Sequence, residues 1–455
     1  MPKDKSIRRG GLARGLRLSL ASARAGGAFA VDGALKKFRG DAPNDDALLN
    51  REARRFARQL GELKGSYVKI GQLLALLGEH FLPAPLTQAL HELENQTRPV
   101  AWSEMQSVFR GSLGARYSEL EVEPAALAAA SLAQVHRARV VSTGESVVVK
   151  GQYPDLLALL DEDFHTVVKM LRLARWIPGS RDFDSWLATL HAQLLAEVDY
   201  PRELLMAKVM AKGLAQHEAL QTTPVTVRVP RFWPHLCGTD VLTMEYVEGY
   251  RAGSPEVAAL PQATRDALGK AMLQLFFTEV FDLGLVQTDP NFGNYLINDE
   301  GSELTLLDFG SVFELHETVR TALCDTILAG LTNDEARLEH ALVALGCLKP
   351  DAGESAKATF KAFIRNLLEP LCSPEALPPQ HLNAEGLYCW GHSELLSRTG
   401  QQVARSLTNR EFAIPSGDFA MVARKLTGVF TFIAVLNAEF NGHDIVKPYL
   451  THTTE

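Results

Sequence analysis

Two polar segments at a fixed separation constrain the fold of this chain more than any other feature of its sequence. The first is Q-T-D-P-N-F-G-N at 287–294, in which Asp289 and Asn294 stand five residues apart. The second is L-L-D-F-G at 306–310, in which Asp308 follows Asp289 by 19 residues. Each segment adjoins a short apolar run typical of strands, at 295–297 and 304–307. A single D-F-G arises by chance fairly often, but both segments at this spacing indicate one shared site.

The residue types in these segments suit phosphoryl transfer. That reaction needs a carboxylate near the nucleophile and oxygen ligands for the metal ion that bridges the phosphates. A catalytic-loop Asp, an Asn five residues later and the Asp of D-F-G form the arrangement used by protein kinases. The pattern therefore predicts a nucleotide-binding lobe earlier in the chain.

The residues of such a lobe are present upstream. Lys150 ends the strand-like run V-V-V-K, where a kinase places the lysine that holds the α- and β-phosphates. The run V-L-T-M-E-Y-V-E-G resembles a kinase hinge, in which backbone groups of Glu245 and Val247 would bind adenine. The usual partner of the lysine is a glutamate on the following helix, for which the candidates are Glu197, Asp199 and Glu203.

The glycine-rich loop expected before Lys150 is missing. In its place the sequence has Ala128, Ala129, Ala130 and Ser131. Their Cβ atoms limit how closely backbone N–H groups can approach a phosphate, which glycines would allow. Gln287 and Thr288 likewise replace the His-Arg pair that precedes the aspartate in a typical kinase.

The segment from Leu49 to Leu77 has apolar residues at alternating spacings of four and three, which predicts an amphipathic helix or a tight pair of helices. A different face carries Gly61, Gly65, Lys69 and Gln72. Two glycines aligned with a lysine and a glutamine favour a close contact with another element. Pro83 and Pro85 then end the pattern.

The rest of the chain has a mixed pattern. Residues 125–149 predict an antiparallel hairpin that turns at Thr143-Gly144, and two further strands are expected at 227–232 and 240–247. Residues 155–216 predict helices, with amphipathic stretches at 156–176 and 186–214. Residues 311–330 are also predicted to be helical, and no A-P-E motif follows Asp308. We therefore do not expect this chain to phosphorylate other proteins.

Composition and charge exclude several classes. Of 455 residues, 46% are hydrophobic and 22% charged, which excludes wholesale disorder. Five cysteines without a C-x-x-C pair indicate a reducing compartment. The net charge is −8, and residues 1–40 hold ten basic and two acidic residues (+8), which leaves −16 on the remainder. That acidic remainder argues against nucleic-acid binding.

The basic arm leaves three interpretations open. It could be a transit peptide, a tether to anionic membrane lipid or a solvated terminus. No apolar run approaches the roughly 20 residues of a spanning helix; that at 426–436 has 11.

Taken together, the motifs resemble the UbiB family of atypical, protein-kinase-like proteins (AarF-like kinases). The resemblance covers about 45–315. It rests on the two polar segments and on V-K-I-G-Q (68–72), A-A-A-S-L-A-Q-V-H (128–136), V-V-V-K-G-Q-Y-P (147–154) and E-V-D-Y-P-R-E (197–203).

The resemblance implies an α+β, bilobal protein-kinase-like fold with an N-terminal helical extension covering the active site. The expected divisions are a basic flexible arm (1–44), the helical K-x-G-Q extension (45–112), an N-lobe with inserted helices (113–248) and a helical C-lobe (249–455). It also implies roles for single residues. Lys150 would pair with Glu203, Asp289 would be the active-site aspartate, and Asn294 and Asp308 would bind Mg²⁺. Lys69 and Gln72 would belong to the covering helix, with Glu197 and Asp199 in the acidic motif that faces it.

The function implied is that of an atypical kinase or ATPase using ATP and Mg²⁺ in ubiquinone (coenzyme Q) biosynthesis at the membrane surface. Expected partners are nucleotide, anionic membrane lipid, a quinone precursor and ubiquinone-biosynthesis enzymes. The expected location is cytoplasmic and peripheral at the inner membrane, or mitochondrial in a eukaryote. Two alternatives stay open: a small-molecule phosphotransferase like the aminoglycoside or choline kinases, and a nucleotide-binding pseudokinase scaffold.

Overall fold

The computed structural model describes most of the chain, which divides into two compact units. The described residues are 51–58, 60, 66–77, 84–91, 99–130, 132–173, 176–177, 181–289, 291–395, 397–398 and 417–451. Parts of the predictions fall outside them, namely the basic arm at 1–44, Gly61, Gly65, Ser131 and the side chain of Gln72.

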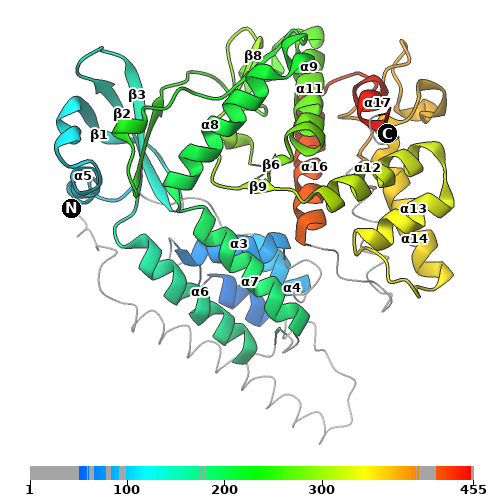
Figure 1. The fold of residues 1–455 in the computed structure, drawn as a ribbon, viewed down its shortest axis with the longest axis horizontal. Coiled ribbons are helices and arrows are strands. Elements are labelled where there is room, and N and C mark those ends of the chain that lie inside the picture. The colour runs from blue at the N-terminus through cyan, green and yellow to red at the C-terminus, as the bar shows by residue number, and fades with distance from the viewer. Residues whose placement is uncertain are drawn as a thin grey trace, which may run out of the picture. The chain divides into compact units, whose positions relative to one another are not determined.

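The first unit comprises the described part of Met1–Arg202 together with Arg231–Tyr246, and it contains a four-stranded antiparallel sheet (Figure 1). In spatial order the strands are β1 (Leu120–Ala129), β2 (Ala133–Val140), β3 (Ser146–Gln152) and β5 (Val241–Glu245). The predicted hairpin is confirmed as β2–β3, and Gly144 adopts the positive φ of +76° that its turn requires. β1 extends the sheet beyond this prediction.

One face of the sheet packs against α5 (Trp102–Leu113). The β-branched Val147 and Val149 alternate onto this face and are fully buried there. Gly151 is needed on the same strand because a Cβ at that position would collide with the ring of Phe109. Two short 3₁₀ segments complete this part of the unit, η1 (Gly114–Glu119) and η2 (Pro234–Leu236).

The other part of the first unit is a layer of helices (Figure 1). Residues 51–58 are helical, and the layer continues with α3 (Ser66–Leu77), α4 (Ala84–His91), α6 (Leu156–Leu173) and α7 (Arg181–Ala196). The predicted apolar stripe forms part of one shared core with α6 and α7. Its described members in that core are Ala53, Phe56, Leu60, Tyr67, Ile70 and Leu74. The helical prediction for this segment is confirmed over its described residues.

The helical prediction for 155–216 is confirmed in kind but wrong in one boundary. The stretch predicted at 186–214 consists of two helices, because α7 ends at Ala196 and α8 (Tyr200–Gln216) begins four residues later. Asp199 causes part of this break, since its carboxylate accepts a hydrogen bond from the backbone N–H of Arg202 at 3.0 Å, as an N-capping residue does. The acidic residues Glu197 and Asp199 therefore lie between helices.

The second unit comprises Glu203–Pro230 and Val247–Glu455, within the described residues, and it is mainly helical. It has a three-stranded sheet in the order β4-β8-β7 and a two-stranded sheet, β6-β9. The strands are β4 (Thr226–Arg228), β6 (Leu285–Gln287), β7 (Tyr295–Ile297), β8 (Glu303–Leu306) and β9 (Val312–Glu314). The strands expected beside both polar segments are thus confirmed as β7 and β8.

Helices surround these strands in sequence. They are α9 (Glu218–Gln221), α10 (Pro255–Ala258), α11 (Gln262–Phe277), η3 (Thr278–Leu283), η4 (Phe292–Asn294), α12 (Glu317–Thr332), α13 (Glu335–Ala344), α14 (Glu354–Leu368), η5 (Glu369–Leu371), η6 (Pro374–Ala376), η7 (Pro379–His381), α16 (Gly417–Val435) and α17 (His443–Thr451).

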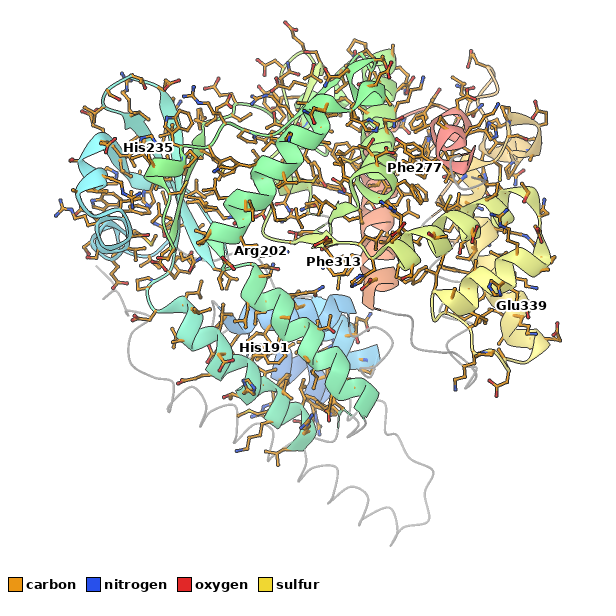
Figure 2. The ribbon with its side chains drawn as sticks, in the orientation of Figure 1. His191, Arg202, His235, Phe277, Phe313 and Glu339 are labelled. Carbon is orange, nitrogen blue, oxygen red and sulfur yellow. The ribbon has the colours of Figure 1, made fainter. Side chains whose placement is uncertain are left out.

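The core of the second unit is built around α11, which is buried along most of its length. At its end Phe277 stacks between Phe281 and Tyr449, with ring centroids 6.0 Å and 5.4 Å away (Figure 2). The helix packs on α16 and α17. Because α11 leads through η3 into β6, this core positions the segment that carries Asp289.

The prediction of helix from residue 311 is wrong at its start. Residues 312–314 form β9, which pairs with β6, and α12 begins only at Glu317. Local periodicity could not show this pairing, because the partner strand lies some 25 residues earlier in the chain. Within the described residues, no helix is both long and apolar enough to cross a bilayer.

Candidate active site

The segment after β6 brings Asp289 and Asn294 into contact. The Asn294 side-chain amide donates a hydrogen bond to Oδ2 of Asp289 at 2.9 Å. The turn between them is stabilised by Asn291, whose side-chain oxygen accepts from the backbone N–H of Gly293 at 2.9 Å. The spacing of five residues therefore places both side chains on one side of a single tight loop.

Hydrogen bonds join this loop to the one that carries Asp308. The backbone N–H of Leu307 donates to the carbonyl of Asn294 at 2.9 Å, and the Thr288 hydroxyl donates to the carbonyl of Ser311 at 2.8 Å. Asp308 itself accepts from the backbone N–H of Gly310 at 3.0 Å. The structure thus holds the two predicted segments next to each other within the second unit.

A residue that the sequence analysis missed completes the surroundings of Asp289. Arg424, on α16, places its guanidinium 3.3 Å from Oδ1 of Asp289, and the two side chains are 15% and 25% exposed. One carboxylate oxygen is therefore held by Asn294 and the other by Arg424. This arrangement limits rotation of the carboxylate and puts a fixed positive charge beside it.

The next residue, Lys425, forms a fully buried ion pair behind the same loop. Its Nζ lies 2.8 Å from Oε2 of Glu279, and the two side chains are only 1% and 0% exposed. Burial by itself would lower the pKa of Lys425, but the Glu279 carboxylate and the Tyr295 hydroxyl raise it above that of an ordinary lysine. Lys425 is therefore a cation inside the core.

A chain of hydrogen bonds runs from this cation to the strand before Asp289. Lys425 donates to the hydroxyl of Tyr295 at 3.1 Å, and that hydroxyl donates to the side-chain oxygen of Gln287 at 3.1 Å. The backbone N–H of Gln287 donates to Glu279 at 3.4 Å. The sequence signal for Arg424 and Lys425 was two adjacent basic residues inside an apolar helix, which is rare unless the charges have partners.

In the first unit, Lys150 lies on β3 opposite Val135 and Leu242. Its ammonium group lies 5.2 Å from the ring centroid of Tyr200, the first residue of α8, in a cation–π arrangement. Glu203 lies in the first turn of the same helix and is only 1% exposed. Of the three candidate partners of Lys150, Glu203 alone is on a helix, and that pairing stays a prediction.

The alanine loop is a tight connection between β1 and β2. Ala128 and Ala129 end β1, and the backbone N–H of Ala130 donates to the carbonyl of Ala133 at 2.8 Å. The hydroxyl of Tyr153 donates to the carbonyl of Ala130 at 2.9 Å. Both backbone groups of Ala130 are therefore engaged within the loop itself.

The hinge-like strand offers fewer free groups than its sequence suggested. The backbone N–H of Glu245 donates to the carbonyl of Arg231 at 2.8 Å, so it is already occupied. Val247 follows directly after the first unit ends at Tyr246. Adenine binding by backbone groups of Glu245 and Val247 stays a prediction.

On α3, the Nζ of Lys69 lies 2.6 Å from Oε2 of Glu197. Glu197 is the residue directly after α7, so the contact joins two parts of the helical layer. Asp199, the other acidic candidate, instead caps α8.

Comparisons with known proteins agree with this geometry. A family model described as the ABC1 atypical kinase-like domain matches residues 92–342. "Atypical kinase COQ8, mitochondrial" of Schizosaccharomyces pombe is 28% identical over 93% of this chain and 67% of its own length. The protein of the same name from Saccharomyces cerevisiae is 30% identical over 62% of this chain, and the matched part spans only 55% of that relative.

A solved structure supports the fold. The complex of Rv3197 with erythromycin, from Mycobacterium tuberculosis, matches with a TM-score of 0.61 over 90% of this chain and 98% of that chain. At 22% identity this likeness concerns the fold alone.

Proposed function

This chain belongs to the ABC1 atypical kinase-like family, which confirms its resemblance to UbiB proteins and its kinase-like fold, and we propose that it is an Mg²⁺-dependent ATP-using kinase or ATPase that supports ubiquinone biosynthesis. The observation that carries the proposal is the contact between Asp289 and Asn294 on a loop hydrogen-bonded to that of Asp308. A carboxylate beside metal-binding oxygens is what phosphoryl transfer requires.

The donor set of this site suits Mg²⁺. Asn294 uses its NH₂ group towards Asp289, so its amide oxygen points away from that carboxylate. That oxygen and the carboxylate of Asp308 are the hard ligands that Mg²⁺ prefers. When bound there, Mg²⁺ would neutralise negative charge on the phosphates of ATP.

Asp289 would orient the attacking hydroxyl or water and accept its proton. Asn294 and Arg424 fix the orientation of its carboxylate from two sides. The guanidinium of Arg424 would also stabilise negative charge on the transferred group. In this proposal Lys150 holds the α- and β-phosphates and is paired with Glu203, as in protein kinases.

The helical layer would restrict what the enzyme can act on. The Lys69–Glu197 ion pair holds α3 to the end of α7, which suits a cover more than a docking surface for protein substrates. Gln72 and Asp199 would belong to the same gating region. The short segment between Asp308 and α12, partly taken up by β9, offers little room for a peptide-binding activation loop.

The proposed place of action rests on the relatives. Several of them carry names that describe atypical mitochondrial kinases. We infer peripheral association with an anionic inner-membrane surface, through the basic arm, and action on a quinone precursor or on enzymes of that pathway.

Phosphate release from Mg²⁺–ATP, measured with and without anionic liposomes and a quinone-precursor mimic, tests the proposal. Wild type should release phosphate, faster with both additions, and Asp289→Asn should lose this activity. Asp299→Asn, an exposed aspartate in the neighbouring β7–β8 turn, is the matched control and should retain it. Nucleotide binding without any turnover in wild type would instead favour the scaffold alternative.

A further inference from the structure

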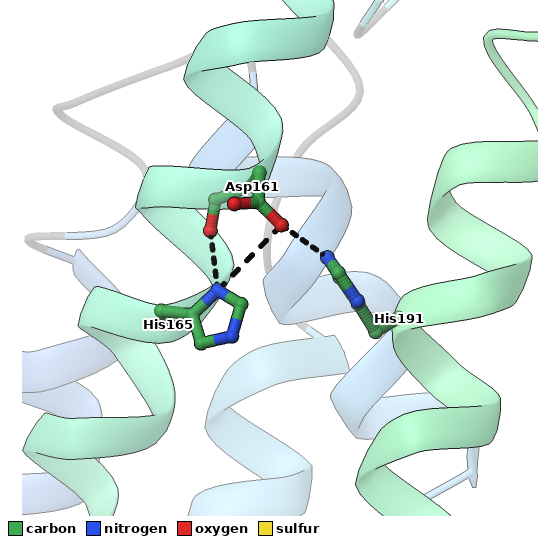
Figure 3. Close-up of side chains that lie close together, drawn as sticks. All are labelled: Asp161, His165 and His191. Carbon is green, nitrogen blue, oxygen red and sulfur yellow. Dashed lines mark hydrogen bonds and ion pairs between the residues drawn. The ribbon is translucent and has the colours of Figure 1, made fainter.

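We propose that Asp161, His165 and His191 form a binding site for a divalent transition-metal ion such as Zn²⁺ between α6 and α7. Figure 3 shows Asp161 and His165 on one helix and His191 facing them from the next. One ligand atom of each residue lies within 4.8 Å of the others. The proposal does not depend on kinase activity, because none of the three residues has a role in it.

Helix geometry explains why these residues converge. Asp161 and His165 are four residues apart on α6, so their side chains share one face of the helix. Nε2 of His191, on α7, lies 2.9 Å from Oδ1 of Asp161, and Nδ1 of His165 lies 3.7 Å from the same oxygen. Two ligands from one helix and a third from its neighbour are a common way to build a metal site in a helical bundle.

The strongest observation concerns Nε2 of His191. This nitrogen is buried, yet within the described part of the chain it has no partner in hydrogen-bond geometry. Its 2.9 Å contact with Asp161 is thus short but misdirected. Such an arrangement is expected of two ligands of one ion, whose lone pairs converge on a point between them at metal–ligand distances of about 2.0–2.2 Å.

The surroundings prepare His191 for this role. Phe164 stacks on its imidazole at a centroid distance of 4.7 Å and an angle of 27°, and Phe164 is itself buried in the core. The His191 ring is therefore oriented before any ion arrives. His165 is 68% exposed, so it can rotate to present either ring nitrogen at little cost.

The ligand types select the class of ion. Two imidazoles and one carboxylate suit Zn²⁺ and its neighbours in the first transition row, whereas Mg²⁺ prefers oxygen ligands throughout. Glu162 and Asp163, next to Asp161 in the sequence, add negative charge that favours a cation. Asp161 is 56% exposed, which leaves room for water as a further ligand.

An ion at this place would stabilise the layer that holds Lys69. Asp163, two residues after Asp161, accepts a hydrogen bond from Ser66, the first residue of α3. His191 lies six residues before Glu197, the ion-pair partner of Lys69. Joining α6 to α7 through a metal ion would therefore fix both helices that contact α3.

The test uses the purified full chain after treatment with a chelator. Zn²⁺ at about 100 times its Kd should raise the melting temperature by about 5 °C, since binding to the folded state stabilises it by mass action. His191→Gln and Asp161→Asn should abolish this shift. His392→Gln, an exposed histidine of the second unit, is the matched control and should keep it.

Two further measurements separate this site from others that bind Zn²⁺. Co²⁺ should give visible absorption with wild type, and the titration should show one equivalent fewer in His191→Gln and Asp161→Asn than in the control. Hydrogen exchange in α7 should slow when Zn²⁺ is added to wild type. An equal shift and stoichiometry in the variants and the control, or an equal shift with Mg²⁺, would overturn the proposal. Circular dichroism establishes that each variant is folded.

Discussion

Nζ of Lys69 lies 2.6 Å from Oε2 of Glu197, and only 18% and 19% of the two side chains are exposed. The pair joins α3 to the end of α7 within one unit of the molecule. Partly buried charges of this kind are costly to separate from one side, because the remaining charge loses its partner while still shielded from water. We therefore regard this pair as the contact that keeps the proposed cover in place.

We predict that Lys69→Ala releases a new activity, most simply autophosphorylation. Removing the ammonium group frees α3 from Glu197, so a hydroxyl of the chain can reach the site that the cover would otherwise occlude. Nucleotide affinity should stay within about twofold of wild type, a difference of about 0.4 kcal/mol. Transfer of radiolabel from ATP to the protein measures the gain.

The control for this prediction is Lys69→Ala combined with Asp289→Asn, which should not incorporate label. No gain in the single variant, or a gain that survives the loss of Asp289, would refute the gating role. A surface lysine without such a role would change stability by less than about 0.5 kcal/mol and activity not at all.

Asp308→Asn should abolish the Mg²⁺-dependent part of nucleotide stabilisation. Replacing a carboxylate with an amide removes the negative charge that attracts the cation while preserving size. A thermal-shift titration with ATP, with and without Mg²⁺, measures the effect, and Asp299→Asn serves as the exposed control. An unchanged Mg²⁺-dependent shift in Asp308→Asn would refute the assignment.

Ala129→Gly should change the affinity for ATP relative to ADP. Ala129 ends β1 at the tight loop before β2, where loss of a Cβ widens the allowed backbone angles and lets N–H groups close on a terminal phosphate. Titration of both nucleotides decides the matter. If both affinities remain within about twofold of wild type, or about 0.4 kcal/mol, the loop does not cover the phosphates.

Lys425→Met should lower the free energy of unfolding by about 3–5 kcal/mol, because it leaves Glu279 buried without its partner. The double variant with Glu279→Gln should lose less than the sum of the single losses. Chemical denaturation of the four proteins gives this coupling. Additive losses would show that the pair does not act as a unit.

The pH dependence of that pair follows from its sign. The pKa of Lys425 is raised in the folded state, so its stabilising contribution is complete below the unfolded pKa near 10.5 and is lost only as pH rises through the folded value. The stability difference between wild type and Lys425→Met should therefore stay constant on the alkaline side of neutrality up to about pH 9. Denaturation at several pH values in that range measures it.

Membrane association should be peripheral and sensitive to salt. The arm at 1–40 carries a charge of +8, which attracts anionic lipid through forces that salt screens. Sedimentation with anionic liposomes should show binding that about 1 M salt releases, since the Debye length is then about 3 Å. Deletion of 1–40 should have the same effect as salt, and binding that persists at high salt would indicate a buried apolar anchor.

Local sequence patterns determined much of this protein. The alternation of β-branched residues predicted β2 and β3, the 3.6-residue period predicted the helices of the first unit, and the apolar runs beside Asp289 and Asp308 predicted β7 and β8. Spacing also predicted that Asp289 and Asn294 belong together, since a five-residue turn leaves few ways to separate them. Each of these features depends on residues close in the chain.

Only the tertiary structure decided which distant residues meet. Arg424 reaches Asp289 across 135 positions, and Lys425 is paired with Glu279 across a similar span. The choice of Glu197 over Asp199 for Lys69, and the meeting of Asp161 with His191, also depend on how helices pack. Periodicity shows which face of a helix is apolar, but the partner of a polar side chain depends on the rotation and register of two packed elements, which no local pattern contains.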